Sequence, residues 1–309
     1  MKSTTHVLIY GDVFVDYIAS DETNTKFNTF LGGATVNVAA GISRLGANSM
    51  LITVIGTDST SEFVRKQLQQ EGVDLSYAVH IPEKKVNGVY VHLTSEHDRV
   101  FAKYVDETPT IQVQPTDLQE EAFRHASILH ICSGTMFQPT ALETTKRAVQ
   151  LAKKTETLLS FDPNIRPLRW KSEEICRETI LPFLNHTDLL KLTEEELYFL
   201  LQADEMEEAL AKLAAFQVPV VMITMGEQGT LAIVDGVRQH VKVDPIDPVD
   251  TTGAGDAFIA GVLRGIQLNG KPNSAEEWLE LIAFGNKMGA LCAMKSGALS
   301  ALPRADELE

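Results

Sequence analysis

Several kinds of residue are scarce in this chain of 309 residues, and each scarcity excludes a class of protein. The three cysteines, Cys132, Cys176 and Cys292, are too far apart for a disulfide framework or for a Cys-x-x-Cys metal or redox pair. The eight histidines show no spacing typical of a tight zinc site. A reducing, cytoplasmic location is therefore expected.

Positive charge is also scarce, because 27 Lys and Arg residues stand against 42 Asp and Glu, for a formal net charge of −15. Nucleic acids and anionic membranes are bound by clustered Lys and Arg, so neither is an expected partner. No apolar run approaches the length of a membrane span, and residues 7–10 are too short for a signal-peptide core. Any phosphate must be bound by local groups.

Short apolar runs alternate with helical patterns along the whole chain, which is typical of a mostly parallel sheet flanked by helices. One domain is expected over residues 1–309. The runs that predict strands are residues 7–10, 50–55, 128–131, 157–161, 189–192, 220–224 and 230–234. The patterns that predict helices are residues 35–45, 61–71, 140–154, 194–201, 206–216 and 275–293, with a further helix after Asp256.

Two regions in the N-terminal third break this rhythm, at about residues 14–31 and 86–105. The second alternates apolar and polar residues, as in Val89, Val91 and Leu93, so both regions are interpreted as antiparallel strands outside the main sheet. The fold class expected is α/β, with a central mostly parallel sheet and a small β-sheet lid over the carboxyl ends of its strands.

The segment from Asp250 to Phe258 carries the strongest chemical signal. Gly253 and Gly255 surround Ala254, and this flexible turn can direct successive N–H groups at one anion where a helix begins. Asp256 follows in the first helical turn, where the helix dipole favours its ionised form, so it is placed as a general base. A purely structural turn with Asp256 as a cap residue is the alternative.

A second glycine pair, Gly32 and Gly33, ends a predicted lid strand and begins a helix. The pair lets a ligand approach the backbone closely, and Asn37 one turn later offers a donor and an acceptor to vicinal hydroxyls. The alternative is a lid hinge with a solvent-facing Asn37.

Together, the Gly32-Gly33-Ala34-x-x-Asn37-Val38-Ala39 motif and the segment 250–258 resemble the two signatures of the ribokinase-like (PfkB) carbohydrate kinases, in their order and over the whole chain. The resemblance implies that Asp256 is the catalytic base and that Gly253, Ala254 and Gly255 form its anion hole. It also assigns the sugar to a set of residues near the lid, namely Asp12, Asp16, Gly32, Gly33, Asn37, Tyr104 and Arg166.

The resemblance further implies an ATP site formed by Asn164, Lys191, Thr224, Gly226, Gly229 and Asn286. Glu196 would serve Mg²⁺ through water, although Thr193-x-x-Glu196 is also a helix capping box. Thr193 departs from the Asn of the family pattern. Asp250 matches a position that often binds K⁺. For Gly226, Gly229 and Asn286, a strand-end turn and a helix-surface residue remain the alternatives.

The function expected is ATP-dependent transfer of a phosphoryl group to a primary hydroxyl of a small neutral sugar. The Gly32-Gly33-Ala34 run and residues 162–167 are most similar to fructokinases. Tyr104 is not followed by the Arg of keto-acid sugar kinases, so a carboxylate substrate would depend on Arg166 alone. Fructose is therefore preferred. A 2-keto-3-deoxygluconate kinase and a non-catalytic sugar-binding regulator are the alternatives, and a homodimer through the lid is a further expectation.

Overall fold

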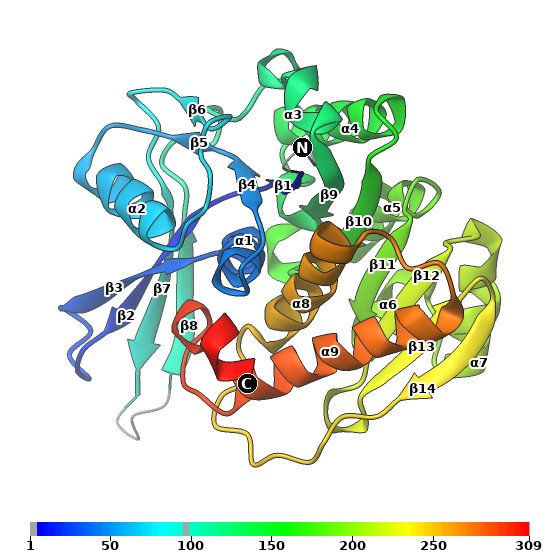
Figure 1. Ribbon diagram of the computed structural model, residues 1–309. Helices are drawn as coiled ribbons and strands as arrows, with labels where there is room; N and C mark the ends of the chain where they lie inside the picture. The colour runs from blue at the N-terminus through cyan, green and yellow to red at the C-terminus, as the bar shows by residue number, and fades with distance from the viewer. Residues whose placement is uncertain (1–4, 95–98, 309) are drawn as a thin grey trace.

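The structure, a computed structural model, describes residues 5–94 and 99–308, and its centre is an eight-stranded sheet (Figure 1). The strands of this sheet are β1 (His6–Tyr10), β4 (Ser49–Ile52), β9 (Ala126–Cys132), β10 (Leu158–Asp162), β11 (Leu189–Thr193), β12 (Val220–Thr224), β13 (Thr230–Val234) and β14 (Val237–Val241). Their order is β14-β13-β12-β11-β10-β9-β1-β4. Neighbours from β4 to β12 run parallel, and β13 and β14 pair antiparallel. The expected mostly parallel sheet is confirmed.

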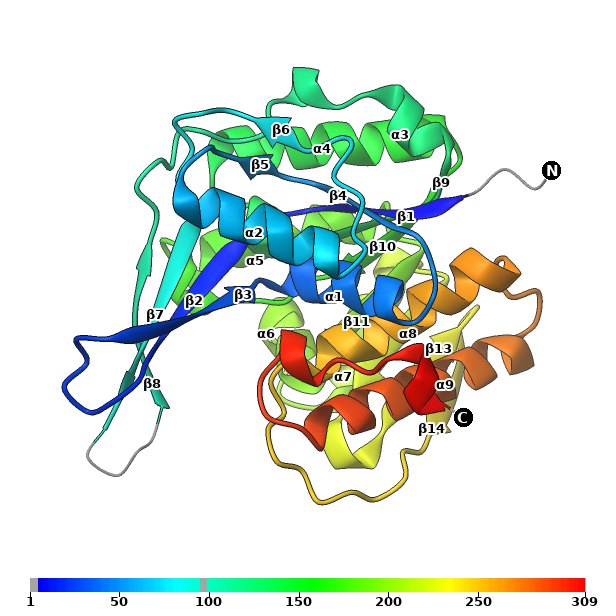
Figure 2. The same cartoon turned by 60° about the vertical axis from the view of Figure 1, so that its left-hand side comes forward.

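Helices cover both faces of this sheet (Figures 1 and 2). One core includes α1 (Ala34–Arg44), α2 (Ser59–Gln70), α8 (Ala254–Asn269) and α9 (Ala275–Ala293). The other includes α3 (Glu120–Arg124), α4 (Pro139–Lys154), α5 (Glu173–Leu184), α6 (Glu194–Leu201) and α7 (Met206–Leu213). Along β1 the side chains alternate between the two cores, with Val7 and Ile9 in the first and Leu8 and Tyr10 in the second. Both faces of this strand are therefore buried, and only His6 at its start is polar.

A separate four-stranded sheet projects from the large one (Figure 2). Its strands are β2 (Phe14–Ala19), β3 (Phe27–Gly32), β7 (Asn87–Leu93) and β8 (Arg99–Val105), in the order β3-β2-β7-β8. The two hairpins are antiparallel as expected, but β2 and β7 pair in parallel. The first strand of each hairpin runs away from the large sheet. The two first strands, β2 and β7, therefore lie side by side and run in the same direction. Residues 95–98 lie outside the described residues.

Several elements differ from the sequence expectation. Residues 50–55 form no single strand: β4 ends at Ile52, and β5 (Val54–Ile55) pairs with β6 (Val79–His80) in another sheet. The helix α5 is not expected because it contains Pro182, which argues against a helix interior. The strand β14 is missed because it is mostly exposed and polar. Among the described residues, no helix has the length and apolar character needed to span a membrane.

The parallel strands bring their carboxyl ends to one edge of the large sheet. The segment after β1 leads from there directly into β2 of the small sheet, and α8 begins at the same edge. In α/β sheets ligands bind at this edge. Side chains from β1, β9, β10 and β11 can therefore meet the start of α8 beneath the small sheet.

Candidate active site

The start of α8 is built around Gly253. This residue has φ +82°, a conformation that favours glycine, and a Cβ there would lie 3.0 Å from the Ala298 Cα atom. The N–H of Ala257 donates to the Gly253 carbonyl at 2.8 Å, which begins the helix. Asp256 thus lies in the first turn, where the helix dipole is positive.

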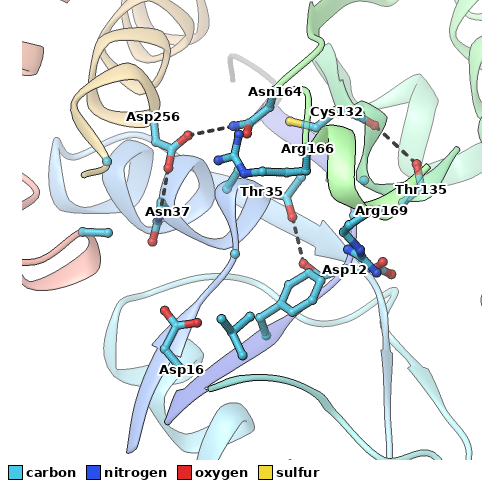
Figure 3. A pocket seen from close by; sticks show the side chains of 18 of the residues that line it. Asp12, Asp16, Thr35, Asn37, Cys132, Thr135, Asn164, Arg166, Arg169 and Asp256 are labelled. Atoms are coloured by element: carbon cyan, nitrogen blue, oxygen red, sulfur yellow. Dashed lines mark hydrogen bonds between the residues drawn. The ribbon is translucent and has the colours of Figure 1, made fainter. Parts of the chain in front are cut away.

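Asp256 is 8% exposed and faces two asparagine side chains (Figure 3). The Nδ2 atom of Asn37 donates to Asp256 Oδ2 at 2.8 Å, and Asn164 Nδ2 lies 3.5 Å from Asp256 Oδ1. Burial raises the pKa of Asp256 to about 6, although the hydrogen bond from Asn37 acts in the opposite direction. A carboxyl with this pKa is ionised at neutral pH and can accept a proton.

A cavity of about 260 Å³ opens beside Asp256, between the edge of the large sheet and the small sheet (Figure 3). Nine of the candidate residues line it: Asp12, Asp16, Gly33, Asn37, Tyr104, Asn164, Arg166, Gly253 and Asp256. They come from segments far apart in the chain. The cavity therefore unites the predicted base with nearly all of the predicted sugar residues.

The side of the cavity away from α8 is formed by the small sheet. Asp16 on β2 is mostly buried, and burial raises its pKa to about 6. The carboxyl of Asp16 fills the space beside Gly32, where a Cβ would lie 2.4 Å from its Oδ2 atom. The side-chain oxygen of Asn37 is buried and has no hydrogen-bond partner among the described residues. Such an oxygen is free to accept a hydrogen bond from a ligand.

Behind the Gly253-Ala254-Gly255 turn lies a buried cluster of charged groups. Lys191 Nζ pairs with Asp162 Oδ2 at 2.9 Å, and a Cβ on Gly255 would lie 2.9 Å from the same Nζ atom. Burial lowers the pKa of Lys191, but Asp162 and Glu196 outweigh this and raise it. A charged ammonium group therefore stands next to the Gly253-Ala254-Gly255 turn.

Glu196 forms the capping box that its sequence pattern predicts. Its two carboxylate oxygens accept from the N–H groups of Thr193 at 2.9 Å and Ile165 at 2.7 Å, and the Thr193 hydroxyl accepts from the Glu196 N–H. Burial and nearby Asp162 raise the pKa of Glu196. Each oxygen keeps a lone pair beyond these bonds, so a water-mediated contact to a cation fits this carboxylate.

The remaining candidate nucleotide residues do not line the cavity. Thr224 ends β12, and Gly226 and Gly229 both have positive φ in the turn that follows. A Cβ on Gly229 would lie 2.3 Å from the Val241 carbonyl oxygen, so close packing also explains this glycine.

Asn286 is not on the surface of its helix, as one alternative held. It is buried: its Oδ1 accepts from the Thr230 hydroxyl at 2.7 Å, and its Nδ2 donates to the carbonyl of Val241 at 3.0 Å. The side chain therefore ties α9 to β13 and β14.

Asp250 joins the segment before α8 to the loop that follows α9. Its Oδ1 accepts from the N–H of Thr252 at 2.9 Å, and its Oδ2 accepts from the N–H of Gly297 at 2.9 Å. These bonds give the carboxylate a structural role. Among residues 5–94 and 99–308, no three His, Cys, Asp or Glu side chains gather as metal ligands.

Comparison with protein families matches residues 4–305 to the pfkB family carbohydrate kinase. The chain belongs to this family. The chain is 34% identical to a fructokinase of Klebsiella pneumoniae, over 98% of either protein. The structure of fructokinase from Vibrio cholerae O395 in its fructose, ADP and calcium ion bound form matches with a TM-score of 0.84 at 30% identity, covering 99% of this chain and 98% of that one.

An aminoimidazole riboside kinase from Salmonella enterica, complexed with aminoimidazole riboside and an ATP analog, matches this pfkB kinase with a TM-score of 0.86 at 26% identity. Each chain is covered over 98% of its length. The ribokinase-like fold expected from the sequence is confirmed, and the protein is a carbohydrate kinase.

Two charged residues of this pfkB kinase's site are absent from the sequence-based set. Asp162 lies at the end of β10 and pairs with Lys191. Arg169 lines the cavity, so a carboxylate substrate would not depend on Arg166 alone, as the sequence suggested. The sequence shows that Arg166 and Arg169 are three residues apart, but the 3₁₀ turn (Pro167–Arg169) that leads from one to the other is seen only in the structure.

Proposed function

We propose that this kinase transfers the γ-phosphoryl group of ATP to a primary hydroxyl of fructose. The observation that carries the proposal is the cavity that places the buried Asp256 carboxylate and its Asn37 partner opposite Asp16 of the small sheet. A polyol in this cavity would meet acceptors at both ends. Asn37 Oδ1, which has no partner among the described residues, offers another acceptor to a hydroxyl.

In this mechanism Asp256 accepts the proton of the attacking hydroxyl. The transition state of phosphoryl transfer is loose, so positioning and charge stabilisation outweigh early proton removal. The N–H groups at the start of α8 would stabilise charge on the transferred group, and the Lys191 ammonium stands beside the same turn. Asn164 would orient Asp256, because its Nδ2 atom lies within 3.5 Å of the carboxylate.

The nucleotide would extend from the anion hole along the ends of β11 and β12 toward Thr224, Gly226, Gly229 and Asn286. Magnesium, when bound with ATP, would neutralise phosphate charge, and Glu196 would hold it through water. Because both donor hydrogens of the Asn286 side-chain amide are used within the protein, its contact with a base would be mainly van der Waals. Potassium near Asp250 remains a prediction of the family resemblance.

The charges of the cavity support a neutral acceptor. Three carboxyl groups, Asp12, Asp16 and Asp256, and two guanidinium groups, Arg166 and Arg169, line it. An anionic sugar would therefore meet no net positive charge. The two arginines do favour 2-keto-3-deoxygluconate as the second candidate, because charge-assisted pairs with a carboxylate are strong. The three cysteines are free and buried, which supports a reducing, cytoplasmic site of action.

The proposal is tested by ADP release from Mg-ATP with fructose, tagatose, ribose, adenosine and 2-keto-3-deoxygluconate. Fructose is expected to give the highest kcat/KM. A preference for the keto acid would replace fructose by the second candidate. ADP release that no acceptor in this panel stimulates would overturn the proposed substrate class.

A further inference from the structure

Arg169 and Asp12 lie near each other in the cavity wall, away from Asp256 (Figure 3). The Arg169 guanidinium lies over three aromatic rings, with its central carbon 3.8 Å from the ring centre of Phe137 and 5.1 Å from those of Phe14 and Tyr104. These contacts hold a long side chain in one orientation, which lowers the entropy lost when it binds a ligand.

The donors of this guanidinium bond to none of the residues that the structure describes. Among the described residues, none accepts a hydrogen bond from the Arg169 side chain, and no carboxylate lies within the 4.0 Å of an ion pair. The group is nevertheless largely buried, and burial lowers its pKa while the charge of Asp12 opposes that effect. The five N–H donors of this guanidinium are therefore available to the oxygens of a ligand in the cavity that it lines.

Arg169 also separates two hollows. A second hollow of about 300 Å³ lies on its other side and is lined mainly by apolar groups, including Phe137, Leu142, Trp170 and Ile175. Arg169 lines both hollows. Its side chain is therefore part of the wall that ends the sugar cavity.

We propose that Arg169 is a specificity-determining residue, which donates hydrogen bonds to the acceptor's oxygens remote from the phosphorylated hydroxyl and closes the cavity against longer acceptors. This inference rests on the proposed function and deepens it, since it restricts the substrate class to unsubstituted monosaccharides. The Asp12 carboxyl stands near Arg169 without forming an ion pair with it, so the guanidinium can donate to a neutral hydroxyl or carbonyl oxygen.

The test is steady-state kinetics of Arg169→Leu and Arg169→Lys, with the acceptor that the wild type uses best. Arg177→Leu is the matched control, because Arg177 also lies over an aromatic ring, Phe199 at 5.0 Å, but does not line the cavity. Arg169→Leu is expected to raise the KM for the acceptor about tenfold to a hundredfold, the range for charge-assisted hydrogen bonds. The kcat should stay within about threefold of the wild-type value, because the lost interaction stabilises the bound acceptor and the transition state equally. The KM for ATP should not change.

Arg169→Lys should recover only part of the affinity, because an ammonium group lacks the planar fork and stacks poorly. An acceptor KM within about twofold of the wild-type value in both variants would overturn the proposal, as would an equal rise in both KM values. If Arg169→Leu does not melt cooperatively, the acceptor KM of Arg169→Lys alone decides whether the proposal holds, with the same limit of about twofold. The acceptor in this test is the one that the wild type prefers. The comparison of variants with the wild type therefore still applies if that acceptor is not fructose.

The closing role is tested with a longer acceptor, a benzyl ether of the sugar at the oxygen farthest from the phosphorylated hydroxyl. The quantity measured is the kcat/KM for the sugar divided by the kcat/KM for this ether. The wild type should discriminate strongly against the ether. Arg169→Ala, which joins the two hollows, should narrow that ratio by about tenfold, a gain typical of added apolar contact in an open pocket. An unchanged ratio would contradict the closing role.

Discussion

At the scale of single residues, the candidate site contains a carboxylate, Asp256, that the fold keeps away from water. Asp256 is buried, its neighbour Asp162 adds negative charge, and Asn37 and Lys191 offset only part of the cost of its ionisation. The same arrangement makes it a stronger base than an exposed aspartate. Burial of Asp256 therefore both increases its basicity and lowers the stability of the fold.

The first prediction concerns turnover. Since the pKa of Asp256 is raised to about 6, kcat/KM should be level above that pH and fall about tenfold per unit below it. Asp256→Asn should lower kcat by about 10² to 10⁴ while the sugar still binds. Rate profiles of both proteins from pH 4.5 to 9 check this. Near wild-type turnover by the variant would remove Asp256 from the mechanism.

The second prediction concerns stability. The folded-state pKa of Asp256 lies above its unfolded value, so the folded protein binds more protons between about pH 4 and 6. The ionised side chain thus destabilises the fold above pH 6, and this cost disappears as the pH falls below 4. Asp256→Asn should be more stable than the wild type at pH 8, by up to about 3 kcal/mol for a shift of roughly two units. Denaturant melts at pH 8 and pH 4 measure the difference, and an equal gain at both values would refute the linkage.

At the scale of elements, helix α8 delivers Asp256 to the cavity, and its start depends on the loop after α9. Gly253 packs on Ala298, while Asp250 holds Gly297 by a hydrogen bond of 2.9 Å. The apolar spacing along α8 predicts the helix, and Phe258, Ile259, Val262, Leu263 and Ile266 are indeed buried. The partner of its first turn lies more than forty residues further along the chain, where no periodicity indicates it.

A third prediction separates the two roles of Gly253. Gly253→Ala meets both a positive φ and the nearby Ala298 backbone, whereas Gly236→Ala has nearly the same φ, +81°, and no atom within 4 Å of its Cβ. The control should cost about 1 kcal/mol of stability and no activity. Gly253→Ala should cost more and lower kcat by about 10² to 10³, as expected for a distorted anion hole. Thermal melts and steady-state kinetics of Gly253→Ala and Gly236→Ala measure these effects. Equal losses of stability and of kcat in the two variants would contradict the packing role of Gly253.

At the scale of the whole molecule, the small sheet leaves apolar side chains exposed. Phe30 is 48% exposed and Phe101 is 43% exposed. Phe30 pairs with Asp16 across β2 and β3, so it extends the face that lines the cavity. An exposed apolar face of this kind is typical of an interaction surface. We propose that a second copy of the chain covers this face, which gives the homodimer expected from the sequence.

The fourth prediction follows from this face. Sedimentation at micromolar concentration should give about twice the chain mass of 34.0 kDa. Phe30→Glu and Phe101→Glu together should shift it to the monomer, because two buried charges would oppose pairing. The control is Val237→Glu, which changes an exposed residue of β14. A monomeric wild type would reject the dimer.

Periodicity, glycine positions and capping residues act over a few neighbours, so the amino-acid sequence alone predicts the layers of the fold and the candidate groups at the start of α8. Elements with weak local signals, such as α5 with its internal proline and the polar strand β14, were beyond that range. Three features are visible only in the folded chain: Arg169 joins Arg166 in the cavity, Asp162 pairs with Lys191, and Asn286 ties α9 to β13 and β14. Such contacts depend on chain segments that meet only after folding, so no pattern along the chain specifies them.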